Sequence, residues 1–136
     1  MLAPKKQKFR KQFRGKTRRK AIKGNELAFG SYGLKTQKSG WIKDREIESA
    51  RIILARATRK QGKFWIRIFP DKPYTKKPPE VTMGAGKGDV AYFVAPVAAG
   101  RVIFEIDGLS EQESKKVFEN VASKLSLPTK FVKRMD

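Results

Sequence analysis

The chain contains no cysteine and no histidine. These absences exclude disulfide bonds, zinc sites built on thiolate or imidazole ligands, and the Ser-His and Cys-His pairs that activate nucleophiles. They also remove the usual proton shuttle near neutral pH. The composition therefore disfavours an enzyme, and we expect no catalytic residue, no cofactor and no metal site.

Long apolar runs are missing as well. No stretch approaches the ~20 residues that cross a bilayer, and the chain begins with charge rather than with the apolar segment of a signal peptide. Transit peptides are also rich in Lys and Arg, but they are typically amphipathic and Ser-rich, which this start is not. We expect a cytoplasmic protein without a membrane partner.

Acidic residues are scarce in one part of the chain only. Residues 1–88 hold 25 Lys and Arg against 6 Asp and Glu, whereas residues 89–136 hold 7 against 7, so the net charge of +19 lies in the front two-thirds. The first 25 residues contain no acid, and their dense positive charge favours a polyanionic partner, nucleic acid above all. A disordered tail that only aids solubility is the alternative. The candidate RNA-binding residues of this arm are Lys5, Lys6, Lys8, Arg10, Lys11, Arg14, Lys16, Arg18, Arg19, Lys20 and Lys23.

The remaining 111 residues, 26–136, are long enough for one hydrophobic core. A strand or bulged hairpin is expected from Glu26, with a turn at 38–40. The apolar period then predicts a helix over 44–61 that Gly62 ends. One side of this helix is apolar. The opposite side is basic and carries Arg45, Arg56, Arg59 and Lys60. We expect this side to contact phosphates, although a solvated charged face is the usual alternative. Ile52 also lies on this side, and its place there is unexplained.

Strands and one further helix are predicted in the rest of the chain. Alternation predicts a strand over 63–69, a turn at 70–73, and strands at 89–97 and 101–107 joined as a hairpin. The proline-rich stretch to Pro79 cannot be a central strand. Ser110 is expected to open a helix with a capping box to Glu113, and 129–133 to form a final strand. Two helices among short strands without regular alternation predict an α+β fold in a single compact domain.

A glycine-rich loop over 83–88 invites a nucleotide-binding interpretation, which the spacing rejects. A P-loop needs Gly-Lys followed by Ser or Thr, and Gly88 follows Lys87 here. The dinucleotide fingerprint fails too, because Asp89 stands at the place of its third glycine. The loop is suited to close approach of its backbone to another surface, or it is a connection without a ligand.

Two segments, RIFPDKPYTKKP and EVTMGAGKGDVAYFVA, resemble the central signature of bacterial large-subunit ribosomal protein sixteen, whose archaeal and eukaryotic counterparts are called L ten-e. The start MLAPKKQKFRKQFRG, FGSYGLK, IESARI and LPTKFV follow in the family's order, so the resemblance covers nearly the whole chain. It implies a hammerhead-type body with a basic arm over 1–25. Three lysines of the signature complete the residues expected to bind rRNA, namely Lys72, Lys76 and Lys77.

The resemblance also implies partners and a role. The partners are 23S rRNA, A-site and P-site tRNA, and neighbouring large-subunit proteins, with no small-molecule substrate and with a cytoplasmic or organellar ribosome as the location. The role is assembly and positioning without chemistry. The loop expected near tRNA comprises Met83, Gly84, Ala85, Gly86, Lys87 and Gly88. Many members carry Arg and Lys at the positions of Thr82 and Ala85. Because this chain lacks those two charges, the resemblance does not imply phosphate contacts at these positions.

Two other classes remain open from the residues alone. A free RNA-binding regulator or chaperone would use the same basic arm and helix. A metal-dependent nuclease would need clustered carboxylates. The acids of the basic region are scattered, and Asp44, Glu46 and Glu48 suit the N-terminal end of a helix better.

Overall fold

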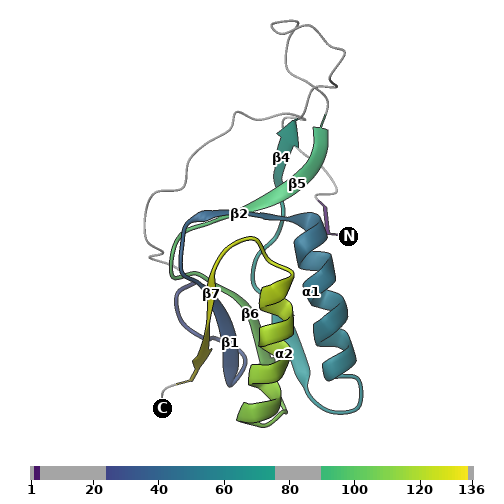
Figure 1. Cartoon of the computed structure of the whole chain (residues 1–136), viewed down its shortest axis with the longest axis vertical. Coiled ribbons are helices and arrows are strands. Elements are labelled where there is room, and N and C mark those ends of the chain that lie inside the picture. The colour runs from purple at the N-terminus through teal and green to yellow at the C-terminus, as the bar shows by residue number, and fades with distance from the viewer. Residues whose placement is uncertain (1, 4–23, 76–89, 135–136) are drawn as a thin grey trace, which may run out of the picture.

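The computed structural model describes residues 2–3, 24–75 and 90–134. These residues form a four-stranded sheet with two helices against one of its faces, and a three-stranded sheet beyond the N-terminal end of the first helix (Figure 1). The α+β class predicted from the sequence is confirmed. The arm residues 4–23 and the glycine-rich loop lie outside the described residues, so the boundary at residue 25 stays a prediction.

The four-stranded sheet is antiparallel and has the order β3-β6-β1-β7. Its strands are β3 (Lys63–Ile66), β6 (Val102–Asp107), β1 (Tyr32–Thr36) and β7 (Thr129–Lys133). In β6, all five residues from Val102 to Ile106 are buried, because the strand lies inside the sheet and is covered on both faces. β6 is therefore the centre of the core, and Glu105, the charged residue among these five, requires partners inside the protein.

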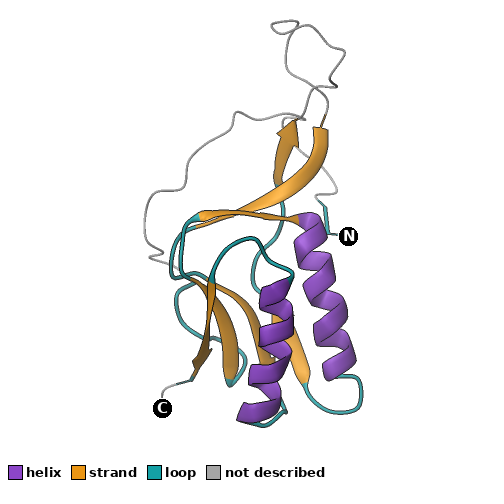
Figure 2. Cartoon of the chain, in the orientation of Figure 1, coloured by secondary structure: helices purple, strands orange, loops and turns teal. Residues whose placement is uncertain are grey.

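The three-stranded sheet has the order β2-β5-β4 and consists of β2 (Gly40–Lys43), β5 (Val90–Val97) and β4 (Lys72–Thr75). All of its pairs are antiparallel. Pro73 lies in the edge strand β4, where a missing N–H costs little. Figure 2 shows this sheet extending away from the helices.

The first helix, α1 (Asp44–Ala57), follows β2 directly. Its apolar side is buried at Ile47, Ala50 and Leu54. At its start, Glu46 accepts from the Lys43 backbone N–H at 3.1 Å and from that of Ser126 at 2.6 Å. This carboxylate therefore caps α1 and ties it to the segment that follows the second helix.

The second helix, α2 (Glu111–Ser123), begins where the sequence predicts. The Ser110 hydroxyl accepts from the Glu113 backbone N–H at 3.2 Å, which satisfies one of the orphan donors of the first turn. Phe118 and Val121 are buried, with Val117 and Leu125 packed at the margin of the core. β7 also has the predicted bounds.

Several predicted boundaries and one pairing are wrong. α1 ends at Ala57 rather than at residue 61, because the Thr58 N–H and hydroxyl both bond to the Leu54 carbonyl and close the last turn. The predicted turn at 70–73 overlaps β4, which begins at Lys72, and β3 stops at Ile66. β5 and β6 form no hairpin, since they pair in different sheets. β2 replaces part of the turn expected at 38–40.

A candidate nucleic-acid interface

The outer side of α1 carries part of the predicted basic surface. Arg56 and Arg59 are exposed and line a shallow hollow of about 220 Å³ together with Arg51, Ile52 and Ala55. Within the described part of the chain, neither Arg56 nor Arg59 forms an ion pair. We call these five residues the α1 basic face. Ile52, which the sequence left unexplained, is 39% exposed in it.

Arg51 differs from its neighbours because Glu48 holds it. Their side chains form two hydrogen bonds from Nε and one from Nη2 at 2.6 Å. The hydrogen bond from Arg51 lowers the pKa of Glu48, and the same bond raises the pKa of the Arg51 guanidinium. Arg51 is thus oriented, whereas Arg56 and Arg59 remain available for an external anion.

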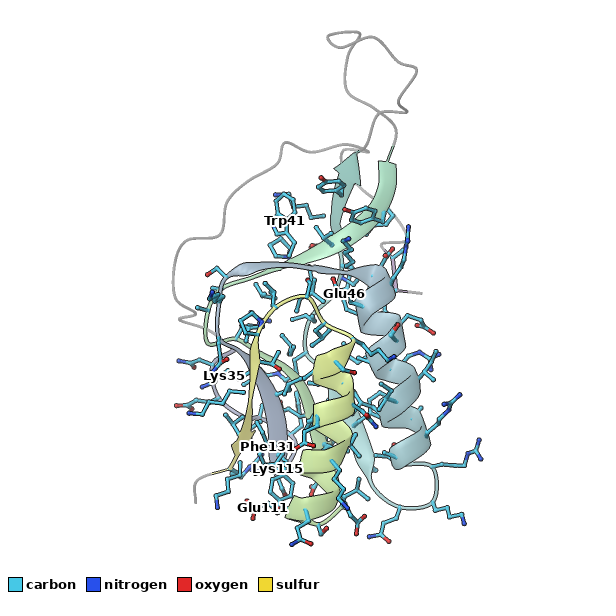
Figure 3. All side chains as sticks on the ribbon, viewed as in Figure 1. Lys35, Trp41, Glu46, Glu111, Lys115 and Phe131 are labelled. Atoms are coloured by element: carbon cyan, nitrogen blue, oxygen red, sulfur yellow. The ribbon has the colours of Figure 1, made fainter. Side chains whose placement is uncertain are left out.

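A group of aromatic rings occupies one side of the three-stranded sheet. Tyr74 and Tyr92 face each other across β4 and β5, and their rings stack at 4.7 Å with an interplanar angle of 10°. Trp41, from β2, meets Tyr74 edge-on at 5.7 Å. Figure 3 shows Trp41 in this sheet, on the same end of the molecule as the start of α1. Offset and edge-on pairs are the arrangements that aromatic rings prefer.

Cations lie over these rings. Lys43 Nζ is 5.3 Å from the Tyr92 ring centre, and Arg45 Cζ is 6.0 Å from it. Lys72 Nζ is 4.8 Å from the centre of the Trp41 ring. Contacts of this kind hold a cation in place without neutralising its charge. The aromatic-cation cluster consists of Trp41, Lys43, Arg45, Lys72, Tyr74 and Tyr92.

The structure thus divides the predicted RNA-binding residues among three places. Arg45 and Lys72 join the aromatic-cation cluster, whereas Arg56 and Arg59 join the α1 basic face. Lys60 is exposed in the turn after α1. The eleven arm residues, Lys76, Lys77 and the six residues of the glycine-rich loop lie outside the described residues.

Sequence reasoning missed the rings and one cation of the cluster. Trp41 and Lys43 are two residues apart in one strand, a spacing that places both on one side. That signal was available, but β2 was not recognised as a strand. The pairing of Tyr74 with Tyr92 had no signal, because the register between β4 and β5 depends on the fold.

The described residues offer no site for metal chemistry. Among them, no three His, Cys, Asp or Glu side chains come together as possible metal ligands. Helices long and apolar enough to span a membrane are likewise absent from the parts of the chain that the structure describes. What this surface can do chemically is bind anions and stack planar groups.

Comparison with known proteins identifies the family of this chain. Residues 4–132 match the family of ribosomal protein L16p/L10e. The chain is 53% identical to the large ribosomal subunit protein uL16 of Parabacteroides distasonis over 136 residues, which cover 100% of this chain and 94% of that protein. It is 52% identical to the protein of the same name from Aquifex aeolicus, over 97% of this chain and 93% of the relative. The chain belongs to the L16p/L10e family of ribosomal proteins.

Proposed function

We propose that this chain is a structural constituent of the large ribosomal subunit and binds 23S rRNA there. The observation that carries this proposal is the match over nearly the whole chain to relatives named as large ribosomal subunit proteins, at about half identity. Its partners are 23S rRNA and neighbouring large-subunit proteins, and its place is the ribosome.

Two described surfaces support the rRNA-binding role. The α1 basic face presents free guanidinium groups, which bind phosphate oxygens in bidentate fashion. The aromatic-cation cluster combines three cations with three rings, which suits contact with both phosphates and unstacked bases. Each phosphate that a cation neutralises releases condensed counterions, so this binding is expected to weaken steeply with salt.

The glycine-rich loop supplies the second half of the proposal. It connects β4 to β5, so Lys72, Tyr74 and Tyr92 of the aromatic-cation cluster lie on the two strands from which the loop leaves and to which it returns. We assign the loop to the tRNA side of the subunit, near the A-site and P-site tRNA arms and the peptidyl transferase region. This assignment is supported by the resemblance of the surrounding sequence to the central signature of the family. The role is positioning, with no chemical step carried out by the protein.

The α1 basic face can be tested by the salt dependence of binding. We would measure the affinity of the full chain for large-subunit rRNA over a range of KCl, with Arg56→Gln/Arg59→Gln as the variant. Each lost phosphate contact should reduce the slope of log K against log salt by roughly 0.7 to 0.9. The matched control is Lys115→Gln/Lys116→Gln, which removes the same charge from exposed positions on α2.

The outcomes separate the alternatives. A reduced slope for the arginine variant and an unchanged slope for the control support rRNA binding through α1. Equal slopes for both variants contradict it. Cosedimentation of the chain with large subunits through a high-salt wash distinguishes a subunit constituent from a free RNA-binding regulator, which would be washed away.

A further inference from the structure

We propose that a groove lined by Phe29, Trp65, Phe69 and Arg101 binds an unpaired nucleotide of the rRNA, with the base stacked on the aromatic rings. This inference rests on the proposed rRNA-binding function and adds a site separate from the α1 basic face and the aromatic-cation cluster. The groove has a volume of about 730 Å³, which is within the range of small-molecule sites.

Exposed aromatic side chains gather in this groove. Phe29 is 57% exposed and Phe69 is 46% exposed, and both line it. Large apolar side chains that remain in water next to each other mark a surface that another molecule covers. The exposed rings therefore suit a planar or apolar occupant.

The stacked rings of Phe29 and Trp65 are held in place by neighbouring groups of the protein. Phe29 stacks on Trp65 with the ring centres 5.8 Å apart and 23° between the planes. The Phe29 backbone N–H donates to Oε1 of the fully buried Glu105 at 2.9 Å, and the N–H groups of Ala28 and Gly30 donate to the same atom. Arg67 Nη1 donates to Glu105 Oε2 at 3.0 Å, and its guanidinium lies 5.8 Å from the Phe29 ring centre.

Rigidity of this kind favours binding. A side chain already fixed in its bound position loses little conformational entropy when a ligand stacks on it. Gly30 adds to the constraint, because a Cβ there would lie 2.5 Å from the Ile106 carbonyl oxygen. The segment that presents Phe29 thus packs closely against β6.

Polar groups in the groove match a nucleotide better than a purely apolar partner. Arg101 Nη2 donates to the Arg67 carbonyl at 3.1 Å, while its buried Nε has no hydrogen-bond partner among the described residues. Within the same residues Arg101 forms no ion pair, so its charge remains available to a phosphate. The exposed Asp71, also in the lining, can accept from the amino group of a base.

Trp65 provides a direct probe of stacking. The chain has two tryptophans, so the fluorescence that Trp65→Phe removes from the unsubstituted chain is the Trp65 signal. Titration of the unsubstituted chain with large-subunit rRNA should quench the Trp65 fluorescence. Phe29→Leu in the unsubstituted chain keeps an apolar side chain but removes the ring, and should weaken rRNA binding roughly tenfold.

Matched variants identify the interaction. Phe29→Tyr keeps the ring and should bind like the unsubstituted chain. Arg101→Gln should weaken binding, whereas Lys115→Gln, which Figure 3 places on α2 at the far end from the three-stranded sheet, should not. Ultraviolet crosslinking of assembled subunits, followed by mass spectrometry, should find a nucleotide on the peptide that contains Phe29 or Trp65.

Three results would overturn the inference. The first is that Phe29→Leu and Phe29→Tyr bind rRNA with equal affinity. The second is that rRNA leaves the Trp65 fluorescence unquenched. The third is a crosslink from this groove to a protein segment, including the arm of this chain. In each case the salt dependence of the α1 variants would still stand, so the groove can fail without the rRNA-binding function. If the unsubstituted chain itself does not bind rRNA, both fail.

Discussion

Replacing Glu105 by Gln should destabilise this protein far more than replacing its ion-pair partner Arg67 by Gln. Glu105 is 0% exposed and accepts from three consecutive backbone N–H groups as well as from Arg67. The variant removes the charge, which weakens the three N–H bonds to the remaining oxygen, and turns an amide NH₂ toward Arg67 Nη1, so the guanidinium loses its acceptor. Breaking a buried charge network from one side costs about 3 to 5 kcal/mol, and the oxygen that Gln retains places the expected loss near about 3 kcal/mol.

Arg67→Gln should cost only about 1 to 2 kcal/mol, because the carboxylate keeps its three backbone donors. The Arg67 side chain is also 17% exposed, so water can replace part of what it loses. The free energy of unfolding is measured by urea titration of the purified chain, with circular dichroism as the signal and equal m-values as the check. In a thermal melt, the Glu105→Gln loss corresponds to a Tm decrease of roughly 12 °C for a domain of this size. Equal losses for the two variants, or a loss below about 1 kcal/mol for Glu105→Gln, would refute the reasoning.

Two further predictions concern the Glu48–Arg51 pair on α1 and the two glycines that flank β6. Because the hydrogen bond from Arg51 lowers the pKa of Glu48, the stabilisation from this pair is present above the carboxyl's ordinary pKa and is lost as the pH falls through the lowered value. An NMR titration of Arg51→Gln should therefore show Glu48 titrating at higher pH than in the parent chain, and an unchanged titration would contradict the pairing. Gly108→Ala should destabilise the protein by more than Gly100→Ala, since both glycines have positive φ, at 87° and 92°, but only a Cβ at 108 meets the backbone of Gly62. Equal losses in urea titrations would show that backbone strain alone decides the cost.

Elements that depend on local pattern were predictable from the sequence. β7 has the predicted bounds, and β5 and β6 each begin one residue after the predicted strand starts. The Ser110 cap could be predicted because its partner, Glu113, is three residues away in the sequence. These features depend on residues that are close in sequence, so the hydrophobic pattern predicts them well.

Pairings between distant segments were not predictable in the same way. β5 and β6 are consecutive strands with a short connection, which favours a hairpin, but each finds its partners in a different sheet. The stacked Tyr74 and Tyr92 depend on that choice of partner. Glu105 had no signal at all, because a Glu in a strand is typically exposed and its N–H partners lie more than 70 residues earlier.

The strand order of the four-stranded sheet also limits when this chain can fold during its own synthesis. β1 spans Tyr32–Thr36, but both of its partners, β6 and β7, lie after residue 101 of 136. Pairings so distant in sequence form slowly, and they cannot form at all until the later strands have left the exit tunnel. β1 therefore emerges with two unpaired edges and must wait for the last quarter of the chain. Until then both edges of β1 lack their partner strands, and truncation before β6 would remove these two strands together with α2.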